Sequence, residues 1–77
     1  MYPEGTFVNS SKNNLIVFEK DIYNPENEGF ICLWNIKNEY NKQLIFKKRL
    51  TKEKALIKFK NLIRDGWKDY RTINKAA

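Results

Sequence analysis

The sequence has no histidine and little cysteine, glycine or proline. The absence of histidine removes the usual general base at neutral pH and the commonest metal ligand. Cys32 is the single cysteine, so an internal disulfide and a multi-cysteine metal site are both excluded. We expect Cys32 to be a small buried core residue. The carboxylates are scattered, and no glycine-rich phosphate loop occurs. The sequence therefore predicts a protein that is not an enzyme and that holds no metal or cofactor.

Long apolar segments are absent as well. The longest unbroken apolar run is residues 30–34, whereas a membrane-spanning helix needs about 20 such residues. Only 3 Gly and 2 Pro occur among the 77 residues, so we see no linker. The hydrophobic fraction of 42% and the charged fraction of 31% are typical of a globular protein. We expect one domain over residues 1–67, a frayed basic tail over residues 68–77, a cytoplasmic location and no membrane contact.

Positive charge is what the sequence has in excess. It holds 15 Lys and Arg against 9 Asp and Glu, a net charge of +6. Residues 1–46 carry 4 basic and 6 acidic side chains, whereas residues 47–77 carry 11 basic and 3 acidic ones. Such a one-sided field attracts polyanions. Lys, Asn and Ile together make up 30 of the 77 residues, and all three have AT-rich codons. Part of the lysine content can therefore reflect genome composition.

Four segments have the pattern of β-strands. Residues 5–8 and 15–18 are apolar and flank a dense cluster of turn residues, which predicts a hairpin. Residues 29–37 alternate, with Phe30 and Trp34 on one face and Ile31 and Leu33 on the other, as in a central strand. After a four-residue loop at 38–41, residues 42–49 form the next strand. We expect that strand to carry Leu44, Phe46 and Lys48 on one face.

One helix is expected over residues 52–65. Thr51 is a suitable N-cap, and Gly66 and Trp67 are placed to end the helix. A stripe of apolar positions should face the core: Ala55, Leu56, Phe59, Leu62 and Ile63. The fold class is therefore α+β, an antiparallel four-stranded β-meander followed by one C-terminal α-helix packed on the sheet. One sheet face is left open, and a second copy of the chain could cover it, so a homodimer is possible.

The C-terminal half provides the candidate site. Its cations surround the end of the last strand and one helix face, and we predict that seven of them contact nucleic-acid phosphates without strong sequence specificity: Lys47, Lys48, Arg49, Lys52, Lys54, Lys58 and Arg64. Tyr23 and Tyr40 lie in expected loops and could stack on bases. The alternative is a protein–protein adaptor that docks on an acidic partner, or that self-associates through its sheet face.

The same half resembles a known family. Residues Leu50-Thr51-Lys52-Glu53-Lys54-Ala55, an amphipathic helix and then Gly66-Trp67 follow the basic cluster at 47–49. This arrangement is similar to the closing motif of domain of unknown function 1651, a small cyanobacterial family. Residues 5–8 and 16–18 match its opening loosely, with Thr6 where the family has Trp. The resemblance implies a cytoplasmic protein of marine picocyanobacteria and supplies no activity.

Overall fold

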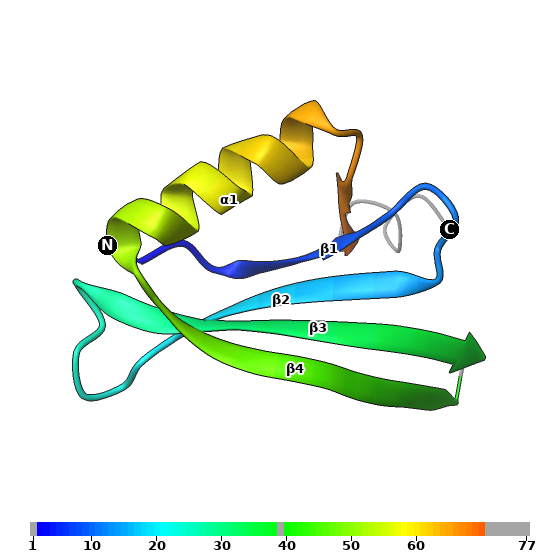
Figure 1. The fold of residues 1–77 in the computed structure, drawn as a ribbon, viewed down its shortest axis with the longest axis horizontal. Coiled ribbons are helices and arrows are strands. Elements are labelled where there is room, and N and C mark those ends of the chain that lie inside the picture. The colour runs from blue at the N-terminus through cyan, green and yellow to red at the C-terminus, as the bar shows by residue number, and fades with distance from the viewer. Residues whose placement is uncertain (1, 39, 71–77) are drawn as a thin grey trace.

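A computed structural model describes residues 2–38 and 40–70. In chain order it has β1 (Gly5–Val8), β2 (Asn14–Lys20), β3 (Glu28–Asn38), β4 (Asn41–Thr51), α1 (Lys52–Arg64) and β5 (Lys68–Asp69). The strands form one sheet in the order β4-β3-β2-β1-β5, and each neighbouring pair is antiparallel. Helix α1 lies along one side of this sheet (Figure 1). The predicted α+β class, antiparallel sheet and single packed helix are confirmed.

The predicted number of strands is wrong, because the sheet has a fifth strand. In β5, Lys68 pairs with Val8 and Asp69 pairs with Phe7, so fraying does not begin at residue 68. The turn after α1 explains the extra strand. Gly66 adopts φ +91°, and the Trp67 N–H donates to the Leu62 carbonyl at 2.9 Å. This reversal brings the chain back to the free edge of β1. The rest of the expected tail, residues 71–77, lies outside the described residues.

Both predicted ends of the helix are confirmed, whereas its predicted core stripe is too wide. The Thr51 hydroxyl accepts a hydrogen bond from the Lys54 N–H at 3.4 Å, as an N-cap does. Ala55 and Leu62 are buried and Phe59 is half-buried. The remaining two members of the stripe, Leu56 and Ile63, are 37% and 54% exposed. They lie at the margin of the stripe, and the sheet beyond β1 continues only as the two-residue β5.

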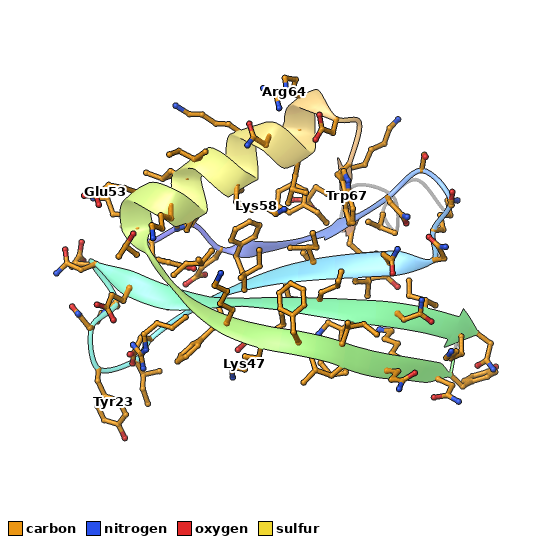
Figure 2. The ribbon with its side chains drawn as sticks, viewed as in Figure 1. Tyr23, Lys47, Glu53, Lys58, Arg64 and Trp67 are labelled. Carbon is orange, nitrogen blue, oxygen red and sulfur yellow. The ribbon has the colours of Figure 1, made fainter. Side chains whose placement is uncertain are left out.

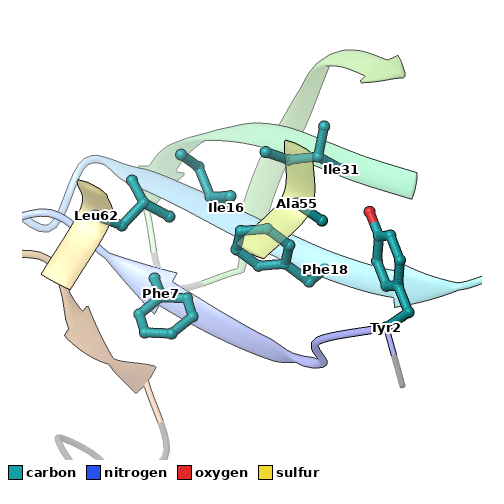
Figure 3. Packing of buried hydrophobic residues seen from close by; sticks show 7 residues of the cluster. All are labelled: Tyr2, Phe7, Ile16, Phe18, Ile31, Ala55 and Leu62. Atoms are coloured by element: carbon teal, nitrogen blue, oxygen red, sulfur yellow. The ribbon is translucent and has the colours of Figure 1, made fainter. Parts of the chain in front are cut away.

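The core lies between α1 and the sheet. Three aromatic rings, Phe7 from β1, Phe18 from β2 and Phe59 from α1, meet with centroid separations of 5.0–6.0 Å. Figure 3 shows Phe7 near Leu62 at one end of the cluster, Phe18 near Ala55 in its middle and Tyr2 at its other end. Tyr2 packs against Gly29, where an added Cβ would lie 2.6 Å from Cε1 of the tyrosine ring. The absence of a side chain at Gly29 therefore allows Tyr2 to be buried.

The sheet has a helix side, which α1 covers in part, and an open side. Ile31 and Leu33 belong to the core on the helix side, so Phe30, Cys32 and Trp34 point to the open side, as the alternation predicted. Cys32 is buried, as expected.

Strand β4 departs from regular alternation. Phe46 pairs with Leu33, but Trp34 pairs with Leu44, so Ile45 is an extra residue in a β-bulge. The bulge places Leu44 opposite Trp34, on the open side, while Phe46 and Lys48 stay on the helix side. The prediction that all three residues share one face is therefore wrong.

Candidate nucleic-acid interface

Three of the predicted cations converge beside α1. Lys48 lies on the helix side of β4, because it pairs with the core residue Ile31. Lys48 and Lys54 line the same cavity of about 230 Å³. Lys58 follows Lys54 by one helical turn and therefore lies on the same flank of α1. Figure 2 shows Lys58 on the side of α1 that faces the sheet.

Phe46 adds an aromatic ring to this group. It precedes Lys48 by two positions on the same face of β4 and is 45% exposed. Within the described chain, Lys48, Lys54 and Lys58 form no ion pair. We call Phe46, Lys48, Lys54 and Lys58 the basic strip. Glu28 also lines the cavity of Lys48 and Lys54, but its carboxylate is paired with Arg49. The Phe46 ring is available for stacking.

Lys47 and Arg49 lie on the other side of the sheet. Lys47 pairs with Cys32 in the β3–β4 register, and Figure 2 shows its side chain below β4, away from α1. Both cations lie over the Phe30 ring at 4.7 Å from its centroid, which covers part of the open side. Lys47 also forms an ion pair of 3.5 Å with Glu19. Lys47 and Arg49, which were both predicted to contact nucleic acid, are therefore not part of the basic strip.

Arg49 is the most firmly held cation of the described structure. Its Nη1 donates to Asp21 Oδ2 at 2.7 Å and to Glu28 Oε2 at 2.9 Å. The hydrogen bond from Arg49, together with one from the Tyr23 N–H, lowers the pKa of the Asp21 carboxyl below its usual value. The same bonds, first to Asp21 and then to Glu28, raise the pKa of Arg49. With Lys47 and Glu19, two cations face three carboxylates, so this cluster offers no net positive charge to a polyanion.

The two remaining predicted cations are separated from the strip by the geometry of α1. Lys52 precedes Lys54 by two residues and therefore lies about 200° away around the helix axis. Arg64 lies on the outer side of α1 in Figure 2, and its Nε forms an ion pair of 3.5 Å with Asp65. The seven predicted residues thus do not form one continuous surface.

The two candidate stacking residues are exposed as expected. Tyr23 is 90% exposed in the loop between β2 and β3, and Tyr40 is 91% exposed beside the first residue of β4. Figure 2 shows Tyr23 at the loop end of the sheet, on the side away from α1. Tyr23 is therefore remote from the basic strip. Tyr40 precedes Phe46 by six residues along the same hairpin, at the opposite end of β4 from Lys48.

Phe46 is the residue of this surface that sequence reasoning missed. The signal was present, because Phe46 precedes Lys48 by two positions in a strand and therefore shares its face. Its exposure could not be read from the sequence, because it depends on how far α1 extends over the sheet. The described residues include no group of three or more metal-ligating side chains. No described helix is long and apolar enough to cross a membrane.

The chain was also compared with known proteins. It matches no protein-family model, no curated protein and no solved structure. The resemblance to domain of unknown function 1651 therefore stays a prediction.

Proposed function

We propose that this protein is a small binding module that takes up nucleic acid without strong sequence specificity, through the basic strip. The observation that carries the proposal is that Lys48, Lys54 and Lys58 lie together with no carboxylate partner in the described structure. Lysine is a point charge that suits phosphate oxygens, and contacts to phosphates carry no sequence information. We further propose that the protein is non-enzymatic and acts in the cytoplasm.

The exposed ring of Phe46 favours a single strand over a duplex. Proteins that bind single strands without sequence preference combine cations along the backbone with aromatic rings on which bases stack. Three phosphate contacts to a single strand predict a slope of about −2 for log affinity against log salt. Binding should therefore weaken about 20-fold between 50 and 200 mM salt.

Charge-neutralising variants test the proposal. Lys48→Gln and Lys58→Gln should each weaken binding to a fluorescent single-stranded DNA or RNA and make the salt slope shallower by about 0.7. Lys60→Gln is the matched control, because it removes the same charge from the side of α1 that faces away from the strip. Fluorescence anisotropy at several salt concentrations gives both quantities.

Equal losses of affinity in Lys58→Gln and Lys60→Gln would reject the basic strip as the interface. Binding would then depend only on the net charge of the protein. Arg49 is unsuitable for this test. A charge reversal there would leave Asp21 and Glu28 facing a third carboxylate, so a loss of binding could reflect damage to the fold.

The alternative, an adaptor that docks on an acidic protein or on a second copy, has its own observation. Leu56, Ile57 and Ile63 are 37%, 61% and 54% exposed on α1. If a protein partner or a homodimer uses these residues, Ile57→Gln and Ile63→Gln should weaken association more than Lys58→Gln does. Sedimentation equilibrium measures self-association directly, and the nucleic-acid titration repeated with the same variants separates the two functions.

A further inference from the structure

A second cavity lies on the open side of the sheet, away from the basic strip. Its volume is about 350 Å³, within the lower range of small-molecule sites. Four strands and the residue after β5 line it: Thr6, Leu15, Val17, Trp34, Lys42 and Tyr70. Leu15 pairs with Trp34, and Thr6 pairs with Val17, so the lining residues occupy adjacent positions on one face of the sheet.

The lining combines aromatic surface with one cation. Trp34 and Tyr70 are half-buried, so each contributes a ring that is partly accessible. Lys42 Nζ lies 5.9 Å from the centroid of the Tyr70 ring. Lys42 forms no ion pair among residues 2–38 and 40–70, and no acidic side chain lines the cavity. The site is therefore apolar and aromatic with one uncompensated positive charge at its margin.

The other end of the same sheet face shows what this combination lacks. There, Lys47 and Arg49 lie over the Phe30 ring, and Glu19, Asp21 and Glu28 neutralise both cations. Ring, cation and carboxylate are all supplied by the chain. At the cavity, the rings of Trp34 and Tyr70 and the Lys42 cation are present, but no carboxylate of residues 2–38 and 40–70 lines it. A ligand that brings its own negative charge and a flat surface would complete the same arrangement.

We propose that this cavity binds a small planar aromatic anion, with its ring against Trp34 and Tyr70 and its charge toward Lys42. A mononucleotide and an aromatic carboxylate share this chemistry. The proposal does not depend on the basic strip, which lies on the helix side of the sheet, so each can fail without the other.

Tryptophan fluorescence tests the proposal. The Trp67→Phe variant leaves Trp34 as the only tryptophan, so its emission reports on the cavity. The probes followed by fluorescence are AMP, UMP and the uncharged nucleoside adenosine. Indole-3-acetate, whose own indole ring fluoresces in the same range as Trp34, is titrated in the ¹H–¹⁵N spectra described below. We expect saturable changes with the anions, and Lys42→Gln in this background should weaken their binding about tenfold, equivalent to about 1.4 kcal/mol. The same Lys42→Gln change should leave the affinity for adenosine unaffected, since adenosine carries no charge that Lys42 could pair with.

Two controls locate the site. Lys37→Gln removes an exposed cation of the same hairpin that does not line the cavity and should leave affinity unchanged. Lys48→Gln, on the basic strip, should also leave it unchanged. In ¹H–¹⁵N spectra of the unmodified chain, ligand should shift the amides of Thr6 and Val17 and the Trp34 indole N–H.

The outcomes are distinct. Binding of both mononucleotides and indole-3-acetate, reduced by Lys42→Gln, supports the proposal in its general form. Binding confined to one of these ligand types supports it and identifies the source of the ligand. The proposal is overturned if no saturable binding is seen up to a ligand concentration of about 10 mM, because any Kd would then lie above the millimolar range. Affinity that responds to Lys48→Gln but not to Lys42→Gln, or shifts confined to α1, would overturn it equally.

Discussion

Tyr2 is a residue whose side chain is buried without full compensation. It is 2% exposed, and its hydroxyl has no hydrogen-bond partner among the residues that the structure describes. Burial, and then the nearby Cys32, raise the pKa of the Tyr2 phenol. The ring contributes apolar contacts to the core cluster, whereas the hydroxyl loses its bonds to water. A buried polar group without a partner costs about 1–3 kcal/mol.

Tyr2→Phe should therefore stabilise the protein. It keeps the ring against Gly29 and removes the unpartnered hydroxyl, so the free energy of unfolding should rise by about 1 kcal/mol. Urea denaturation measures the change. Tyr40→Phe is the matched control, because that ring is 91% exposed and its hydroxyl stays in water. A lower stability for Tyr2→Phe would contradict the prediction, because it would show that the hydroxyl is satisfied in solution.

The pairing of Asp21 and Glu28 with Arg49 belongs to the scale of elements. It joins the loop between β2 and β3, and the start of β3, to the end of β4. Asp21 is 28 residues from Arg49 in the chain, and no local pattern announces the contact. In the sequence, Asp21 follows an expected strand by three residues and Arg49 belongs to the basic cluster at 47–49, and nothing in either segment indicates that the two side chains meet. Their mutual neutralisation depends on the register of three strands.

This pairing predicts a loss of stability in acid. Because the pKa of Asp21 is lower in the folded state than in the unfolded chain, its contribution is complete above the unfolded pKa of about 3.9. The contribution is lost as pH falls through the folded value. Urea midpoints measured between about pH 6 and pH 2 should fall more steeply for the natural chain than for Asp21→Asn. Parallel curves for the two proteins would contradict the assignment.

The elements differed in how far the sequence predicted them. Alternation at residues 29–37 identified both faces of β3, since a period of two is visible in the sequence itself. Thr51 and Gly66 marked the helix ends because capping is local chemistry. The bulge at Ile45 and the strand β5 depend on partners distant in the sequence. The candidate site stays a prediction, and its division between two sheet sides follows from the alternation along β4, which separates Lys48 from Lys47 and Arg49.

At the scale of the whole molecule, both described ends of the chain pack against the rest of the fold. Tyr2 lies in the core beside β2 and β3, and β5 extends the sheet at the edge of β1. The N-terminal strand β1 is thus held between β2 and a segment about 60 residues later in the chain. Val8, which pairs with Lys68, is 2% exposed.

Shortening the chain tests whether β5 contributes to stability. A protein that ends at Trp67 should have a lower free energy of unfolding than one that ends at Tyr70, by about 1–3 kcal/mol, because it loses β-ladder hydrogen bonds and uncovers Val8. Comparison of these two lengths isolates residues 68–70. Equal urea denaturation curves would show that Lys68–Asp69 contributes nothing to stability.

The extra residue Ile45 reverses the alternation of side chains between the two sides of the sheet at this point of β4. Along β4, even-numbered side chains after the bulge lie beside α1, whereas Lys42 and Leu44, also even-numbered, lie on the opposite side with Trp34. Without the bulge, Lys42 would join Phe46 and Lys48, and the aromatic cavity would lose its cation. Deleting Ile45, by contrast, would remove the bulge but leave Leu44 opposite Trp34 and Lys42 opposite Ile36, so both residues would stay on the open side. One strand can thus supply lysines to two separate sites, because a single extra residue reverses the alternation of its side chains.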